Sequence, residues 1–196
     1  RILVIDDNTA IHEDFRKILM EKQTLGDDFL DMESQLIGAE IQTWPAASFE
    51  IDSAFQGKEG FDLVKKAQSL GHPYALAFVD GRMPPGWDGI ETIRHLWKEY
   101  PDLQIVLCTA YADYSWKEIC SALGETDNLL ILKKPFDKVE VLQIAHSLTR
   151  KWELTREVQY QIKNLDDRVR KKTEEKDHLG ALLKTALDHS PAGIII

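Results

Sequence analysis

The chain has 196 residues, of which 43% are apolar and 29% charged, as is typical of a soluble globular protein. This length suits one complete domain with an appendage and excludes a two-lobed enzyme. Residues 1–150 carry 15 Lys and Arg against 25 Asp and Glu, whereas residues 151–196 carry 9 against 8, and so acidic a first domain argues against nucleic acid as a direct partner. The two cysteines are too few for a disulfide framework, and no apolar stretch is long enough for a membrane span. We therefore expect a cytoplasmic protein.

Short apolar runs alternate with helical patterns over the first 150 residues. The runs lie at 2–5, 49–54, 74–79, 103–107 and 129–132, and the helical patterns lie near 9–20, 58–70, 88–99, 114–123 and from Asp137 onward. Most of the runs are apolar throughout, which is typical of parallel strands covered on both faces. The alternation predicts an α/β domain of the flavodoxin-like kind, a doubly wound five-stranded parallel sheet in the order 2-1-3-4-5.

One connection, at residues 21–48, is far longer than the roughly 2–6 residues that usually join such elements. Within it, residues 28–37 have apolar side chains at helical spacing, with an acidic start and Gly38 as a stop signal. We interpret the segment as a packed insertion that holds a short helix. A partner-binding role is the alternative.

The helical pattern that starts near Asp137 has no Gly or Pro before Gly180, and a heptad register runs through it from Thr155. Sustained heptads with flanking charge indicate a coiled coil, and Lys172 and Lys176 loosen its seam. A single exposed helix is the alternative, but it would leave the apolar stripe in water. We predict a parallel homodimer with the seam residues Ile162, Leu165, Val169, Leu179 and Leu183.

Polar residues follow four of the five apolar runs, in each case at the same end of the run. Asp6 and Asp7 end the first run, Asp80 the third, Thr109 the fourth and Lys134 follows the fifth. The carboxyl ends of parallel strands meet at one edge of the sheet, where ligands of such folds bind. Taken singly, each residue has an ordinary structural role, such as a helix cap or a solvated charge. Those separate roles do not explain why complementary groups stand at four strand ends.

Three neighbouring carboxylates repel one another unless a cation compensates them, and oxygen ligands favour Mg²⁺. A phosphoryl group could then be attacked by Asp80, as carboxylate nucleophiles do. Lys134 would pair with the phosphoryl oxygens, and the hydroxyl of Thr109 would donate a hydrogen bond to one of them. The pattern predicts formation of an aspartyl phosphate at this edge.

Four motifs, "ILVIDD", "FVDGRMPPGWDGIE", "LCTAY" and "LKKPF", occur in this order. Over residues 1–148 the chain resembles the receiver domain of two-component response regulators, which accepts a phosphoryl group from a cognate histidine kinase or phosphotransfer protein. The resemblance implies a cis peptide bond before Pro135, which costs little at an X-Pro bond. It also implies these roles: Asp80 as phosphoacceptor, Asp6, Asp7, Asp80 and the backbone carbonyl of Arg82 as Mg²⁺ ligands, Thr109 as switch hydroxyl and Lys134 as pocket lysine.

The chain departs from the family pattern in three places. The loop after Asp80 is one residue longer than usual, through residues 84–87, and the insertion at 21–48 is unusual. The family's switch aromatic falls at Ile131, for which Tyr111 or Trp116 are the substitutes that the sequence offers.

The last 15 residues, "LLKTALDHSPAGIII", resemble the entry into a PAS sensor domain. We therefore expect a receiver at 1–148, a coiled-coil signalling helix at 149–188 and the start of a PAS-like domain at 189–196. Such an order suggests a larger signalling protein whose output is a diguanylate cyclase or a histidine kinase.

Three other functions compete with the non-enzymatic receiver. A phosphoaspartate hydrolase of the haloacid-dehalogenase kind needs an Asp two residues after the nucleophile, where this chain has Arg82. A histidine kinase with His146 as the phosphorylated residue lacks the acid that follows such a histidine. A purely structural dimeriser would leave the pocket residues idle.

Overall fold

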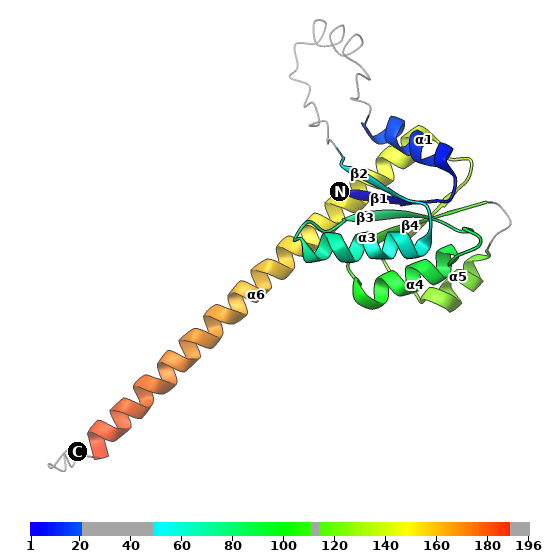
Figure 1. Ribbon diagram of the computed structural model, residues 1–196. Helices are drawn as coiled ribbons and strands as arrows, with labels where there is room; N and C mark the ends of the chain where they lie inside the picture. The colour runs from blue at the N-terminus through cyan, green and yellow to red at the C-terminus, as the bar shows by residue number, and fades with distance from the viewer. Residues whose placement is uncertain (21–48, 111–113, 189–196) are drawn as a thin grey trace, which may run out of the picture. The chain divides into compact units, whose positions relative to one another are not determined.

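The computed structural model describes residues 1–20, 49–110 and 114–188. A sheet of five parallel strands has the order β2-β1-β3-β4-β5, which confirms the predicted flavodoxin-like topology (Figure 1). The strands are β1 (Ile2–Ile5), β2 (Ile51–Ala54), β3 (Leu76–Asp80), β4 (Gln104–Thr109) and β5 (Leu129–Lys133).

The helices follow the predicted pattern with small shifts at their ends. They are α1 (Thr9–Met20), α3 (Gly57–Ser69), α4 (Gly89–Glu99), α5 (Trp116–Leu123) and α6 (Lys138–Asp188). Asp88, predicted as helical, is the N-cap of α4, and its carboxylate accepts a hydrogen bond from the Glu91 amide at 2.8 Å. A short polar side chain at this position stabilises a helix start because it satisfies an amide that has no partner within the helix.

Helices cover both faces of the sheet. On one face, α1 and the first turns of α6 bury Phe15, Val141 and Ala145 against the strands. On the other face, α3, α4 and α5 pack side chains such as Ile93 and Ile119 (Figure 1). This double cover explains why β1, β3 and β4, the inner strands, are mostly apolar rather than alternating.

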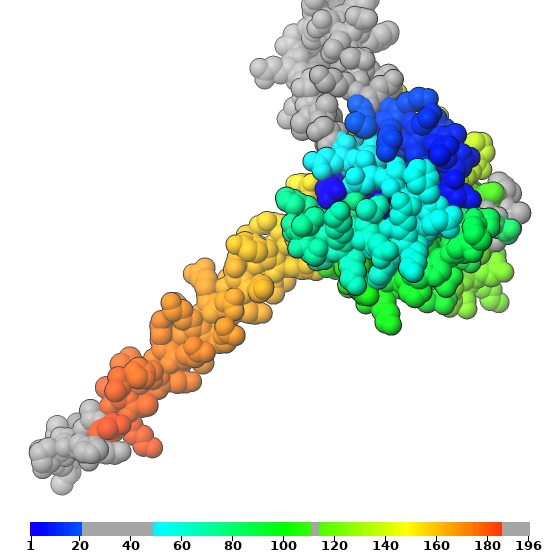
Figure 2. Space-filling view, in the orientation of Figure 1, coloured from blue at the N-terminus to red at the C-terminus, as the bar shows by residue number. Residues whose placement is uncertain are grey.

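The chain divides into two units, Arg1–Trp152 and Glu153–Ile196. In the second unit, the described part is a single helix, the continuation of α6, and the space-filling view shows it one helix wide (Figure 2). Its large apolar side chains are between 54% and 63% exposed at the five predicted seam positions, Ile162, Leu165, Val169, Leu179 and Leu183. An apolar stripe at this exposure has no partner within its own helix.

Two predicted features, the helix at 28–37 within the 21–48 insertion and the PAS-like start at 189–196, lie outside the described residues. Among the helices that the structure describes, none combines the length and the hydrophobicity that a bilayer crossing requires.

Candidate functional site

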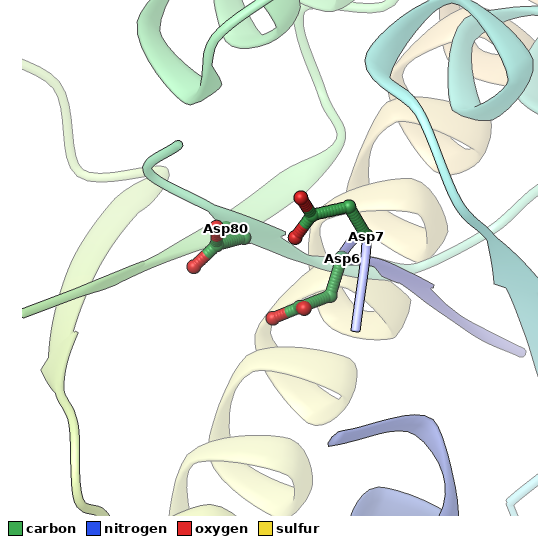
Figure 3. A group of neighbouring side chains, drawn as sticks. All are labelled: Asp6, Asp7 and Asp80. Atoms are coloured by element: carbon green, nitrogen blue, oxygen red, sulfur yellow. The ribbon is translucent and has the colours of Figure 1, made fainter. Parts of the chain in front are cut away.

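The carboxyl ends of the strands bring the predicted site residues to one edge of the sheet. Asp6 and Asp7 directly follow β1, and Asp80 ends the neighbouring strand β3. One carboxylate oxygen from each of these three residues lies within 4.8 Å of the others, and Figure 3 shows the three groups gathered at the strand ends. Parallel pairing of β1 with β3 therefore turns two distant sequence motifs into one acidic cluster.

Asp6 is the most firmly held member of the cluster. Its side chain is buried, and its carboxylate accepts hydrogen bonds from the Asn8 amide at 2.9 Å and from Lys134 Nζ at 2.7 Å. Its own amide donates to the carbonyl of Ala54 at 3.1 Å, so the end of β2 also fixes it. Asp7, in contrast, is exposed.

Lys134 joins two of the carboxylates. Its Nζ lies 2.7 Å from Asp6 Oδ2 and 2.6 Å from Asp80 Oδ1. Burial by itself lowers the pKa of Lys134, but the hydrogen bonds to Asp6 and Asp80 and their charges outweigh it, so the pKa lies above its ordinary value. Lys134 therefore stays cationic and neutralises part of the acidic cluster.

Asp80 combines a fixed carboxylate with access from solvent. Oδ2 accepts a hydrogen bond from the Arg82 amide at 3.1 Å, while the side chain keeps 12% of its surface exposed. The next strand end supplies Thr109, which is buried and whose carbonyl accepts the Lys134 amide at 2.8 Å. The site residues Asp80, Thr109 and Lys134 thus lie at the carboxyl ends of β3, β4 and β5.

Two cis peptide bonds flank the site, at Lys134–Pro135 and Pro84–Pro85. The first is the one that the resemblance implied. The second lies in the lengthened loop after Asp80 and was not predicted.

The position of the family's switch aromatic is occupied by Ile131, which packs partly buried against the apolar core. Of the two substitutes predicted from the sequence, Trp116 is 65% exposed at the start of α5, and Tyr111 lies outside the described residues. Tyr114 is a third aromatic that sequence reasoning missed, and its hydroxyl donates to the Gly81 carbonyl at 3.1 Å. An aromatic ring therefore does contact the loop that follows Asp80.

The donor set fits a hard divalent cation. Mg²⁺ prefers oxygen ligands in proteins. The site offers three carboxylates with oxygens within 4.8 Å of one another, and the loop after Asp80 adds backbone carbonyls. One ammonium group, that of Lys134, does not by itself balance the three carboxylates, so a bound cation would reduce their mutual repulsion. Asp6, Asp7, Asp80 and the carbonyl of Arg82 are the groups that would hold it.

Comparisons with known proteins agree with this geometry. The response regulator receiver domain family matches residues 34–146, more than half of the 196 residues. The chain therefore belongs to the response regulator receiver domain family, a family of signalling modules of two-component systems. Membership implies a histidine kinase or phosphotransfer protein as partner.

Solved structures show the same fold at low sequence identity. The receiver domain of NtrX from Brucella abortus is 18% identical, with a TM-score of 0.53 over 76% of this chain and 98% of that one. The REC domain of AraT, a response regulator from Geobacillus stearothermophilus, is 20% identical, with a TM-score of 0.55 over 79% and 96%. A CheY-like receiver domain protein from Methanospirillum hungatei is 21% identical, with a TM-score of 0.50 over 80% and 96%. No match was found among the curated proteins.

Proposed function

We propose that the chain is a phosphoacceptor receiver in which Asp80 is phosphorylated with the help of Mg²⁺. The observation that carries the proposal is the contact of Lys134 with both Asp6 and Asp80 at the edge where the three carboxylates meet. A nucleophile, a cation-binding acid pair and a fixed ammonium group are the parts that phosphoryl transfer to a carboxylate requires.

In the proposed reaction, one carboxylate oxygen of Asp80 attacks the phosphorus atom of the donor, and the bond from phosphorus to the donor's leaving group breaks. For acetyl phosphate, the products are the aspartyl phosphate and acetate. Bound Mg²⁺ supplies charge neutralisation between the acids and the incoming phosphoryl group. Lys134 pairs with one phosphoryl oxygen by shifting from its present carboxylate partners, and the hydroxyl of Thr109 hydrogen-bonds to another.

The hydrolase alternative is not favoured. A haloacid-dehalogenase-like enzyme uses a second Asp two residues after its nucleophile as an acid and base. Arg82 occupies that position here, and its backbone amide hydrogen-bonds to Asp80 Oδ2. A guanidinium does not release a proton near neutral pH, so it cannot serve as that acid and base.

The proposed domain layout is a receiver at 1–148, a signalling helix at 149–188 and the start of a PAS-like domain from 189. The helix would form a parallel coiled-coil homodimer that relays the phosphorylation state to an output domain, a diguanylate cyclase or a histidine kinase. We place this module in the cytoplasm, where its kinase or phosphotransfer partner would meet it.

The test is intact-mass measurement after incubation with acetyl phosphate and MgCl₂. One added phosphoryl group is expected in the parent chain, and none in Asp80→Asn or when EDTA replaces MgCl₂. Asp88→Asn is the matched control, because Asp88 caps α4 in the same loop and should remain dispensable for labelling. Labelling of Asp80→Asn at the parent's level would show that the phosphoacceptor is a different residue.

A further inference from the structure

A buried histidine contacts the backbone of the acidic cluster. His12, on α1, is 3% exposed, and its ring lies against Phe55 with 4.6 Å between ring centroids. Its Nε2 is 2.7 Å from the backbone carbonyl oxygen of Asp6. A carbonyl oxygen only accepts hydrogen bonds, so Nε2 carries the proton and donates it.

That carbonyl belongs to the peptide bond that joins Asp6 to Asp7. Because a peptide unit is planar, fixing the direction of its C=O also fixes the direction of the Asp7 amide and Cα. The Asp6 amide and carboxylate are held by Ala54, Asn8 and Lys134, as described above. His12 supplies the contact that orients the plane between the two acids.

Stability alone does not account for a histidine at this position. Phe15 and Leu19, on the same buried face of α1, are apolar. Nδ1 of His12 is buried and has no hydrogen-bond partner among the described residues, which is unfavourable for a polar atom. A leucine would fill this space without that cost, so the bond from Nε2 to the Asp6 carbonyl is the contribution that distinguishes histidine here.

We propose that His12 is a positioning residue for the cation site, holding the Asp6–Asp7 peptide so that both carboxylates stay directed at the position of the ion. The inference rests on the proposed function, since it concerns the Mg²⁺ that the acids would bind. Groups that orient metal ligands in this way typically change metal affinity about 10- to 100-fold when removed.

The experiment measures Mg²⁺ affinity directly, without a phosphodonor. The amide NMR signals of Gly81 and Arg82 are followed while MgCl₂ is titrated into the full 196-residue chain at constant ionic strength. His12→Leu removes the donor and should weaken Mg²⁺ binding by about tenfold or more. His12→Gln places an amide N–H close to the position of Nε2. Its Mg²⁺ midpoint should therefore lie within about threefold of the parent's, a much smaller change than the roughly tenfold loss expected for His12→Leu.

A second pair of variants separates positioning from folding. His12→Asn is as polar as His12→Gln but too short to reach the Asp6 carbonyl, so it should bind Mg²⁺ as weakly as His12→Leu. Leu19→Ala, further along the buried face of α1, should lower the melting temperature and leave the Mg²⁺ midpoint unchanged. If His12→Leu does not fold, the comparison of the Gln and Asn variants decides.

A kinetic readout adds a second criterion. With acetyl phosphate, the Leu and Asn variants should need more Mg²⁺ for half-maximal labelling while approaching the parent's rate at saturating Mg²⁺. Parent-like Mg²⁺ midpoints in both the Leu and Asn variants would overturn the positioning role. If the parent chain binds no Mg²⁺, or if the Asp7→Ala variant binds Mg²⁺ as tightly as the parent does, the result would instead count against the proposed cation site itself.

Discussion

The individual residues at the strand ends determine the net charge of the candidate site. Asp6 and Asp80 share the ammonium group of Lys134, whereas Asp7 adds a third carboxylate to the cluster. In the absence of a cation, Asp7 therefore contributes repulsion, and the fold gains little from it. In the proposed cation-bound state, Asp7 would supply a third carboxylate ligand and so strengthen binding of the ion.

Asp7→Asn should accordingly leave the melting temperature in EDTA unchanged or slightly raised, and should abolish most of the stabilisation that MgCl₂ gives. A ligand that binds only the folded state stabilises it by about 2.7 kcal/mol at 100 times its dissociation constant, so the parent should show a clear upward shift. Thermal unfolding with and without MgCl₂, at matched ionic strength, measures both effects.

Asp14→Asn, at an exposed acid of α1, is the control for the change in net charge. It should keep the parent's response to MgCl₂. An equal MgCl₂ shift in Asp7→Asn and in the parent would remove Asp7 from the cation site.

The sequence predicted that the polar residues directly after the apolar runs lie together, because the edge of a parallel sheet brings such positions together, and in the structure Asp6, Asp80 and Lys134 are in contact. Sequence reasoning did not find His12 or Tyr114. The spacing of His12 from Phe15 and Leu19 places it on the apolar stripe of its helix, so the sequence pattern indicates only a buried core residue. Both side chains hydrogen-bond to backbone carbonyls, His12 to that of Asp6 and Tyr114 to that of Gly81, and the sequence does not show which backbone acceptor a side chain contacts.

At the scale of elements, the start of α4 is packed against the end of β3 with no room for a side chain. The Gly89 amide donates to the Gly81 carbonyl at 3.0 Å. A Cβ added at Gly89 would lie 2.4 Å from the Asp80 carbonyl oxygen and 2.9 Å from the Gly81 Cα. Both are backbone atoms, so relief requires that α4 or the strand end move.

Gly89→Ala should therefore destabilise the receiver by about 1 to 3 kcal/mol, the usual cost of overpacking. It should also slow phosphorylation of Asp80, since the displaced strand end carries the nucleophile. Urea unfolding followed by circular dichroism gives the stability, and the initial rate of labelling by acetyl phosphate gives the reactivity.

Gly180→Ala is the matched control, because a Cβ there has no atom within 4 Å and the residue lies inside α6. It should stabilise the helix by about 0.5 to 1 kcal/mol. A Gly89→Ala variant with the parent's urea midpoint would show that α4 adjusts without strain.

The sequence predicted which segments form helices and which form strands, but it predicted the first and last residues of these elements less well. Asp80 and Thr109 mark the ends of strands in the sequence because they are polar, yet both belong to the ladder, where Asp80 pairs with Cys108 and Thr109 with Lys133. The expected strand at 49–54 begins at Ile51. The cis bond at Pro84–Pro85 was not predicted from the sequence.

For the whole molecule, the long connection after α1 does not change the order of the strands, although the match to the family covers only the part of the chain from residue 34. The family match begins at residue 34, so Asp6 and Asp7 lie outside it. In the structure, β1 nevertheless lies between β2 and β3, where the family's fold requires it. Motif order and the rule for parallel strand ends predicted the position of the two acids beside Asp80, because neither depends on the length of the connection.

The described part of the second unit carries a stripe of exposed apolar side chains. Along α6, the seam residues Ile162, Leu165 and Val169 repeat at heptad spacing, each more than half exposed. One helix cannot bury this stripe by itself, whereas two parallel copies can, with knobs of each helix in the holes of the other. Parallel pairing also keeps two receivers at one end of the helix pair and two following domains at the other.

Lys172 and Lys176 occupy seam positions in this register, and they make the pairing weaker than a continuous apolar seam would. A seam of moderate stability can shift between two arrangements when phosphorylation of Asp80 changes how the receivers pack, which is a shift in populations and not a new fold. We therefore expect a parallel homodimer whose helix pair responds to the state of the receiver.

Light scattering should give about twice the monomer mass of 22.4 kDa for the parent chain at tens of micromolar. Ile162→Asp combined with Leu165→Asp should reduce it to the monomer mass, because two buried carboxylates would face each other across the seam. Tyr160→Asp combined with Asn164→Asp adds the same residues off the seam and should keep the dimer. Since the receiver folds around its own core, the seam variant should still be labelled at Asp80. A monomeric parent, or a seam variant that remains dimeric, would show that this stripe does not hold two chains together.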